Sequence, residues 1–252
     1  AMVRAYLVCA TPRSGSTLVC EALKGTGVAG RPEEYFEAVP ATGRLPRPAD
    51  YLEGLDDAEA LALVGGAPAR EPPPYSSLEG VGSYDEHVAR ALEWGTTPNG
   101  VFGAKLMWDH VGRLPALGDP RYVWVRRGDV VRQAVSLWRA MQTQSWRDDS
   151  TDGEGGQHAP QYSFAALRHL VARLTDHDAR WREFLAGAPV LEVTYEELTA
   201  DLPGVIRRTL DHVGVADSVD IPQPAMRRQA DELSEAWVAA YARDQEPLMT
   251  ST

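Results

Sequence analysis

A short loop near the start of the sequence combines a cation with small and hydroxyl-bearing residues, and such a loop can bind phosphate. Its residues are Arg13, Ser14, Gly15, Ser16 and Thr17. Small side chains let a phosphate approach the backbone, where the N–H groups and the dipole of a helix start attract an anion. The apolar run at residues 6–10 predicts a buried strand before the loop, and a helix is expected to begin at residue 16 or 17. The pattern predicts a phosphate-binding strand–loop–helix unit.

The loop differs from that of the nucleotide triphosphatases. A Walker loop has a glycine, four further residues and then Gly-Lys-Ser or Gly-Lys-Thr, with the lysine on the outer phosphates. Here the loop has one glycine, Gly15, and the cation Arg13 precedes it. From the residues alone, the alternative is an ordinary strand-to-helix turn capped by a serine or threonine. The apolar strand and Arg13 favour phosphate binding.

Strand and helix patterns alternate along the chain. Apolar runs predict strands at residues 4–10, 101–106, 121–126 and 190–194. Helical spacing predicts helices at residues 17–26, 56–64, 84–94, 130–144, 164–185, 203–213 and 225–243. We therefore expect an α/β protein with one domain over residues 1–252, a three-layer P-loop-like fold in which helices flank a central parallel β-sheet. Residues 147–160 have almost no apolar side chains and are predicted to form a mobile loop.

Composition limits the classes of protein to consider. The chain has 252 residues and a formal net charge of −11, which argues against nucleic-acid binding, because binding to a phosphate backbone requires basic excess. A few local cations can still attract one anionic ligand. No apolar run approaches the roughly 18 residues of a membrane span, and without a leader pattern we expect a cytoplasmic protein. Cys9 and Cys20 are expected to be free buried thiols, and no ligand spacing predicts a metal site.

Two further cations stand where predicted strands end. Lys105 lies near the end of the strand at 101–106, and Arg127 follows the strand at 121–126. In a parallel sheet these ends meet at the edge where Arg13 lies, so we expect Lys105 to supply a second cation to the anion beside Arg13. Each has an ordinary alternative. Lys105 could reach from a strand end to solvent, and Arg127 could pair locally with Asp129.

Two adjacent glutamates, Glu33 and Glu34, are candidates for a general base. They precede Tyr35 and Phe36, and apolar bulk of that kind desolvates a carboxylate and raises its pKa toward the range in which it accepts a proton. The same residues also fit a solvated surface pair of carboxylates. The residues alone leave both interpretations open.

Five segments, in order over nearly the whole chain, carry a shared pattern. They are residues 12–17, 30–36, 98–108, 127–139 and 228–231, the last followed by Trp237 and Tyr241. The first resembles the loop that holds the 5′-phosphosulfate in sulfotransferases that use 3′-phosphoadenosine 5′-phosphosulfate. The others resemble the bacterial branch typified by trehalose 2-sulfotransferase. The resemblance implies a metal-independent enzyme that moves a sulfuryl group to the hydroxyl of a small molecule and releases adenosine 3′,5′-bisphosphate.

The resemblance also assigns roles to individual residues. It implies Glu34 as the base, with Arg13 and Lys105 as the catalytic cations. The implied cofactor-binding residues are Pro12, Arg13, Ser14, Gly15, Ser16, Thr17, Arg127, Ser136 and Arg228. The implied acceptor-binding residues are Pro12, Arg31, Glu33, Glu34, Tyr35, Phe36, Glu37, Pro46 and Tyr51. Arg127 and Ser136 would clamp the 3′-phosphate, with Arg126 an alternative to Arg127 and Arg227 an alternative to Arg228. By analogy alone, the branch suggests a homodimer.

Two departures and two rival functions remain. Where the branch has glutamine and an acid, this chain has Pro12 and Arg31. Arginine in place of an acid reverses the local charge and disfavours a neutral disaccharide, so the acceptor stays open between another sugar and a hydroxyl of an acidic small metabolite. An ATP-dependent small-molecule phosphotransferase would share the loop but is expected to need magnesium and a lysine within it. A non-catalytic nucleotide-binding protein would share the fold, although Glu34, Lys105 and Arg13 together argue against lost catalysis.

Overall fold

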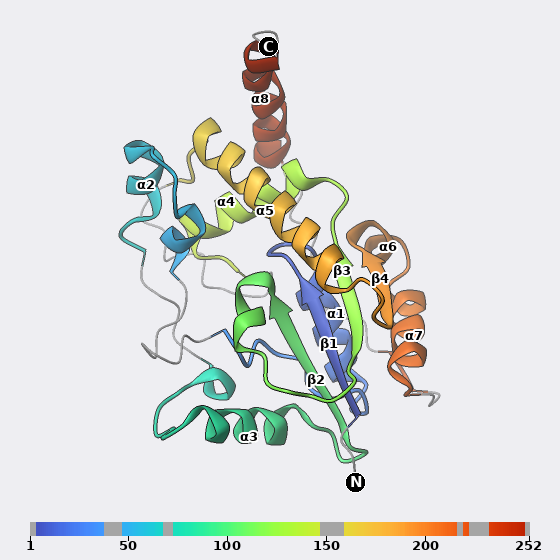
Figure 1. Ribbon diagram of the computed structural model, residues 1–252. Helices are drawn as coiled ribbons and strands as arrows, with labels where there is room; N and C mark the ends of the chain where they lie inside the picture. Colours follow the sequence, from blue (N-terminus) through green and yellow to red (C-terminus); the bar gives the residue numbers. More distant parts are fainter. Residues whose placement is uncertain are drawn as a thin grey trace. The chain divides into compact units, whose positions relative to one another are not determined.

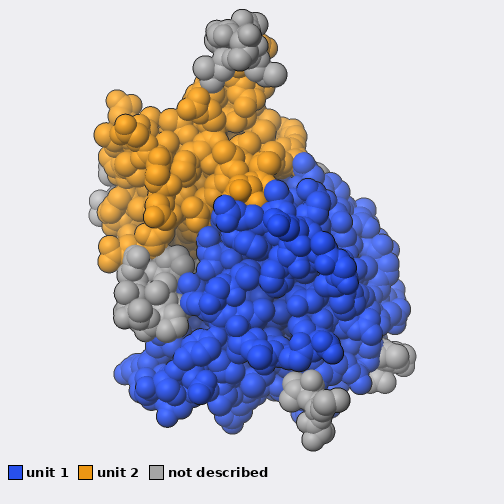
Figure 2. Space-filling model, in the orientation of Figure 1, with its two compact units in different colours: residues 1–46, 70–128, 177–224 blue, residues 47–69, 129–176, 225–252 orange. Residues whose placement is uncertain are grey.

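The computed structural model divides the chain into two compact units, coloured separately in Figure 2. It describes residues 4–37, 47–67, 73–146, 159–215, 219–221 and 232–249. The first unit comprises residues 1–46, 70–128 and 177–224, and the second comprises residues 47–69, 129–176 and 225–252. Each unit therefore combines three separate stretches of chain. The expectation of a single domain stays a prediction.

A four-stranded parallel sheet forms the centre of the first unit (Figure 1). Its strands are β1 (Arg4–Ala10), β2 (Val101–Met107), β3 (Arg121–Arg126) and β4 (Val190–Thr194), in the order β2-β1-β3-β4. β1 pairs with β2 from Arg4 opposite Val101 to Ala10 opposite Met107. Because the strands are parallel, the segments that follow them leave the sheet at one edge. The predicted α/β architecture with a central parallel sheet is confirmed.

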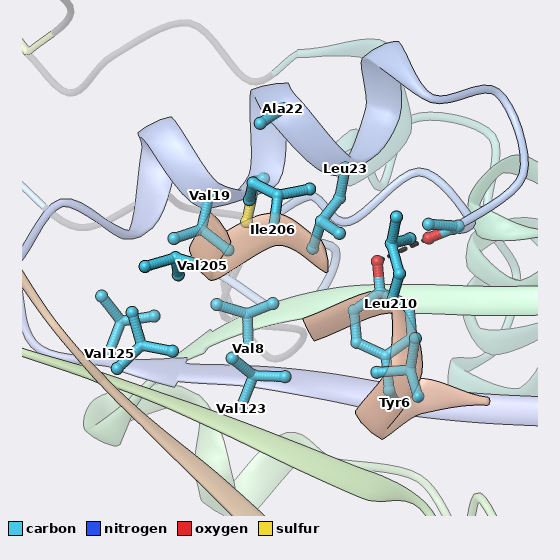
Figure 3. Close-up of a cluster of buried hydrophobic side chains, with 14 of the residues drawn as sticks. Tyr6, Val8, Val19, Ala22, Leu23, Val123, Val125, Val205, Ile206 and Leu210 are labelled. Carbon is cyan, nitrogen blue, oxygen red and sulfur yellow. Dashed lines mark hydrogen bonds between the residues drawn. The ribbon is translucent and has the colours of Figure 1, made fainter. Parts of the chain in front are cut away.

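One face of this sheet packs against helices α1 (Ser16–Gly25), α6 (Tyr195–Ala200) and α7 (Leu202–Val213). Side chains two apart on a strand share a face. Val8 and Val125 accordingly meet Val19 of α1 and Ile206 of α7 in one buried cluster (Figure 3). At its edge the Tyr6 hydroxyl donates to the carbonyl of Ala29, the dashed bond in Figure 3. This packing fixes α1, and with it the loop that precedes α1.

The other face carries α3 (Tyr84–Gly95), the last turns of α5 (Phe164–Phe184) and the short helices η2 (Pro74–Ser76) and η3 (Trp108–Arg113). Phe102 and Leu106 of β2 and Trp124 of β3 join Ala91 of α3 and Trp181 of α5 in a second buried cluster. The Trp181 indole N–H donates to the carbonyl of Ala10 at 2.9 Å. This bond holds the end of β1 where the loop begins.

The second unit is helical. It contains η1 (Pro48–Leu52), α2 (Ala58–Val64), α4 (Val130–Thr143), the first part of α5 and α8 (Glu232–Met249). Trp138 and Met141 of α4, Leu170 of α5 and Tyr241 of α8 share its core. The last helix was predicted at 225–243. It is described from Glu232 and continues to Met249, six residues beyond the predicted end.

Some expectations fall on parts of the chain that lie outside the described residues. These are residues 225–231 of the predicted last helix and residues 147–158 of the predicted mobile loop. Among the helices that the structure does describe, none has both the length and the apolar character needed to cross a lipid bilayer.

Candidate active site

The loop between β1 and α1 has a backbone shape that few residues adopt. Arg13 has a φ of 64° and Gly15 a φ of 92°, both in the left-handed region. Gly15 is the N-cap of α1 and forms no side-chain capping bond. The alternative of a turn capped by serine or threonine is therefore wrong. The first N–H groups of α1 lack a side-chain cap, and with the helix dipole they form a positive end that suits an anion.

No side chain fits at Gly15. A Cβ atom there would lie 2.9 Å from Cδ2 of Tyr195 and 3.2 Å from Cδ1 of Leu198. Both neighbours belong to α6, which begins directly after β4. Two separate reasons therefore require glycine at position 15: the positive φ and the close approach of α6.

Ser14 lies fully buried between Arg13 and the start of α1. Its Oγ atom has no hydrogen-bond partner within the described residues. A buried hydroxyl left in that state costs about 1–3 kcal/mol, which a ligand or a water can recover by bonding to it. Together with the uncapped helix and Gly15, this hydroxyl makes the loop fit a phosphate or sulfate group.

Lys105 is a buried cation between the loop and Glu34. Its ammonium donates to Thr17 Oγ1 at 3.2 Å and forms an ion pair with Glu34, with Nζ 2.6 Å from Oε1. Burial by itself lowers the pKa of the Lys105 ammonium, but the charge and hydrogen bond of Glu34, with the nearby Cys20 and Glu33, together outweigh it, so the pKa of Lys105 lies above its usual value. Lys105 is only 7% exposed, so the alternative of a lysine reaching to solvent is wrong.

The structure separates the two adjacent glutamates. Their segment lies along β2, where Glu33 pairs with Ala104 and the Lys105 N–H donates to the Glu33 carbonyl at 2.9 Å. Glu34 then meets Lys105, whereas Glu33 forms an ion pair with Lys24 of α1. Neither is the solvated surface carboxylate of the alternative interpretation. Of the two, Glu34 is the acid beside the cation that reaches the loop.

Arg126, the last residue of β3, is engaged away from the loop. Its Nε lies 3.0 Å from Asp178 Oδ2, and its Nη1 lies 2.5 Å from Glu192 Oε1. The guanidinium also covers the ring of Trp124, with Cζ 4.6 Å from the ring centroid. Three partners therefore hold Arg126 on the face of the sheet that carries Trp124.

Arg127, the next residue, turns to the loop instead. Its Cζ lies 4.4 Å from the centroid of the Tyr195 ring, and its Nη1 donates a long hydrogen bond of 3.5 Å to the carbonyl of Arg13. Tyr195 is the residue that leaves no room for a side chain at Gly15. Of the two alternatives, Arg127 is the arginine that lies beside the loop.

Comparison with known proteins identifies the family. The model of the Stf0 sulphotransferase family matches residues 5–244. The chain belongs to the Stf0 sulfotransferase family. Two relatives named trehalose 2-sulfotransferase, from Mycobacterium tuberculosis and Mycolicibacterium smegmatis, are 37% and 35% identical to it, over 95% of this chain and 94% and 95% of theirs. The resemblance seen in the sequence motifs is confirmed, and the protein is an enzyme.

One solved structure gives a weaker likeness. The sulfotransferase domain from the Synechococcus PCC 7002 olefin synthase is 14% identical, over 94% of each chain, with a TM-score of 0.42. That score is too low to support an argument about the site of this sulfotransferase.

Several residues expected to bind the acceptor have partners within the sulfotransferase itself. Tyr35 and Phe36 lie in the core, and the Tyr35 hydroxyl donates to the carbonyl of Arg31 at 2.6 Å. The Arg31 guanidinium donates to the carbonyls of Trp94 and Thr96, where α3 ends. These contacts account for all three residues without a ligand. Their part in acceptor binding stays a prediction.

Glu37 is also buried and bonded. Its carboxylate accepts from Ser76 Oγ at 3.0 Å, and its carbonyl accepts from Arg113 Nη2 at 3.3 Å. Arg113 Nε donates to the carbonyl of Phe36 at 2.7 Å. These bonds fasten the end of the segment that carries Glu34. We assign Glu37 a structural contact and keep its acceptor role as a prediction.

For four expected site residues the structure does not show a place in the site around the loop. Tyr51 on η1 and Ser136 on α4 belong to the second unit. Pro46 and Arg228 fall outside the described residues. Pro12 is buried within the loop itself. Over the described stretches, no three histidine, cysteine or acidic side chains form a group able to hold a metal ion.

Sequence reasoning missed His110, which is buried in η3 three residues beyond β2. Its Nδ1 accepts from the N–H of Met107 at 3.3 Å, so the neutral ring carries its proton on Nε2. Burial lowers the pKa of His110 to about 4, and the charges of Glu34 and Lys105 also act on it. The one feature of the sequence that could have pointed to His110 is its position shortly after a predicted parallel strand. The same is true of Tyr195, which follows β4.

Proposed function

We propose that this enzyme transfers the sulfuryl group of 3′-phosphoadenosine 5′-phosphosulfate to a hydroxyl of a small molecule, with Glu34 as general base. The observation that carries the proposal is the line of contacts from Thr17 through the Lys105 ammonium to the Glu34 carboxylate. It sets a proton acceptor next to a loop suited to an anion. Membership of the family supports sulfuryl transfer, and the motif resemblance supports this donor.

The loop residues fit the 5′ end of that nucleotide. The Ser14 hydroxyl is buried without a partner among the described residues, the helix start lacks a side-chain cap, and Gly15 has no room for a Cβ. When bound, the nucleotide supplies the activated sulfuryl group. Ser14, the first N–H groups of α1 and Arg13 would hold its phosphate, because charge-assisted bonds of this kind are the strong ones.

Glu34 and Lys105 would act as a pair. An ionised Glu34 can accept the proton of an acceptor hydroxyl within hydrogen-bond reach. Once Glu34 is neutral, it keeps only a hydrogen bond to the Lys105 ammonium, and the positive charge that it no longer balances can stabilise negative charge in the loop. Charges act strongly on one another in such a buried setting. Proton transfer would thus redirect the charge of Lys105 toward the loop.

Arg127 would bind the nucleotide from the side of α6. A planar guanidinium offers five N–H donors and binds phosphate in a fixed geometry. The ring of Tyr195 and the carbonyl of Arg13 orient the side chain. We keep the clamp of Arg127 with Ser136 and Arg228 on the 3′-phosphate as part of the proposal.

The proposed acceptor is a sugar or another small hydroxylated metabolite. The two relatives named trehalose 2-sulfotransferase make trehalose the first acceptor to test. Arg31 donates to two carbonyls at the end of α3 and keeps its positive charge, so hydroxylated metabolites that carry an acid belong in the same test. Pro12 in place of glutamine remains the departure that argues for testing other sugars beside trehalose.

Calorimetric titration tests the donor class. Adenosine 3′,5′-bisphosphate should bind without added magnesium and more tightly than ADP. Tighter binding of ADP with magnesium would overturn the proposal in favour of a phosphotransferase. If the bisphosphate binds but labelled donor gives no product with a panel of sugars and hydroxylated metabolites, the proposed acceptor class is overturned.

Two finer expectations go with this proposal. A homodimer, expected from the family, can be checked by light scattering. The expected cytoplasmic location can be checked by cell fractionation. Both stay predictions.

A further inference from the structure

Lysine is rare in this chain, and both lysines lie beside the adjacent glutamates. Of the 25 basic residues, 23 are arginine, and the two lysines are Lys24 and Lys105. Lys24 pairs with Glu33 and Lys105 with Glu34. An ammonium is a compact charge with three donors on a slim stem, whereas a guanidinium is broad and planar. A lysine at position 105 therefore suits a site that takes a compact positive charge whose N–H groups donate in several directions.

The ammonium of Lys105 is held from two different elements. Glu34, in the segment beside β2, provides Oε1 at 2.6 Å, and Thr17, in the first turn of α1, provides Oγ1 at 3.2 Å. These are its two side-chain partners in the described part of the chain, and they engage two of its three N–H donors. Thr17 belongs to the helix turn whose N–H groups face the loop.

We propose that Thr17 is a positioning residue whose hydroxyl holds the Lys105 ammonium between Glu34 and the anion-binding loop. The inference rests on the proposed function, since it assigns Lys105 to the reacting site. The sequence predicted that Thr17 binds the nucleotide directly, which stays a prediction, and the structure adds that its oxygen accepts from Lys105. Without that oxygen, the ammonium would keep Glu34 as its partner and turn away from the loop.

Turnover and binding distinguish this role from a direct phosphate contact. Thr17→Val keeps the shape of the side chain and removes the acceptor. It should lower turnover about tenfold and leave the dissociation constant of adenosine 3′,5′-bisphosphate within about twofold. In a Lys105→Met background the same change should have no further effect on turnover, because the partner is gone. Thr17→Ser returns the oxygen and should restore most of the turnover.

A second measurement does not depend on transfer activity. With ¹⁵N-labelled lysine, the ammonium spectrum of this chain contains only two signals, one from each lysine. The Lys105 signal, assigned with Lys105→Met, should exchange with water about tenfold faster in Thr17→Val, while the Lys24 signal stays unchanged. Thr175→Val is the matched control, because the exposed hydroxyl of Thr175 bonds only within α5 among the described residues. It should leave both signals unchanged.

Two results would overturn the inference. One is an unchanged exchange rate of the Lys105 signal in Thr17→Val. The other is weaker nucleotide binding in Thr17→Val that is equally large in the Lys105→Met background, which would show that Thr17 contacts the phosphate. If wild-type protein transfers no sulfuryl group to any acceptor, the proposed function fails, yet the exchange rates still decide whether Thr17 holds Lys105.

Discussion

Replacing Glu34 by glutamine tests the base most directly, because the neighbouring Glu33 provides a matched control. Both side chains are glutamates paired with a lysine, Glu34 with Lys105 and Glu33 with Lys24. Their exposed fractions are similar, 19% and 14%. The two side chains differ mainly in where they point: Glu34 points to Lys105 beside the loop, and Glu33 points to Lys24 of α1. A loss confined to Glu34→Gln would therefore report contact with the reacting site rather than charge or burial in general.

The expected loss of turnover can be bounded from the chemistry and the contacts. Removing a general base lowers turnover about 10²- to 10⁴-fold. Glutamine keeps a carbonyl oxygen that accepts from Lys105, so binding of adenosine 3′,5′-bisphosphate should stay within about threefold. Glu33→Gln should lower turnover less than about tenfold, because Lys24 also pairs with Glu21 at 2.7 Å.

Glu34→Gln also has a stability cost that the assay must separate from catalysis. Removing one partner of a buried ion pair costs up to about 3–5 kcal/mol. Since the amide keeps one hydrogen bond to Lys105, we expect about 1–3 kcal/mol. The pKa of Lys105 is raised above its usual 10.5 when folded, so its contribution is present at neutral pH and is lost as pH rises through the folded value. The variant lacks much of that contribution already at neutral pH.

Three measurements separate these effects. Transfer of labelled sulfuryl group to an acceptor gives turnover, calorimetry with adenosine 3′,5′-bisphosphate gives binding, and urea unfolding gives stability. An inactive Glu33→Gln beside an active Glu34→Gln would refute the assignment of the base. Equal losses in both variants would mean that the two ion pairs only hold their segment in place.

Three other predictions each rest on a particular contact or burial. Arg127→Ala should weaken binding of adenosine 3′,5′-bisphosphate about tenfold or more in calorimetry. Arg126→Ala should change it less than about threefold, because its ion pairs lie elsewhere. Gly15→Ala should lower the free energy of urea unfolding by about 1–3 kcal/mol, given its positive φ and the contact with Tyr195; an unchanged value would contradict this. The pKa of His110 falls from 6.5 to about 4 on folding, so acid favours the unfolded chain. The free energy of unfolding should therefore be about 2 kcal/mol lower at pH 5 than at pH 8 on account of this residue. In His110→Asn, urea unfolding should show that this part of the pH dependence is gone.

Local patterns predicted most of the secondary structure. The strands predicted at 121–126 and 190–194 have the bounds observed for β3 and β4. The helix predicted at 130–144 ends one residue earlier, because Gln144 adopts a left-handed conformation with a φ of 58°. The short helices η1 and η3 were missed, since five or six residues are too few to show a period. Missing η3 meant missing His110.

The sequence left open which of two neighbouring arginines faces the loop, and the pleat of the strand explains why. Side chains alternate between the two faces of a sheet. Val123 and Val125 pack toward α1, while Trp124 lies in the cluster on the opposite face. Arg126 falls on the face of Trp124 and stacks on its ring, and Arg127 turns to the loop. Alternation predicts that the two diverge, but only the tertiary packing decides which face carries α1.

The loop joins features that oppose folding when no anion is bound. It has an orphaned buried hydroxyl at Ser14 among the described residues and a helix start without a side-chain cap. Each is compensated by negative charge or by an acceptor oxygen at the same place. The net charge of −11 does not prevent this, because screening limits the reach of the remote carboxylates to about 8–10 Å, so Arg13 and Lys105 dominate the local field. An anion that meets both features therefore binds to the folded chain alone, and its binding energy adds directly to the free energy of unfolding.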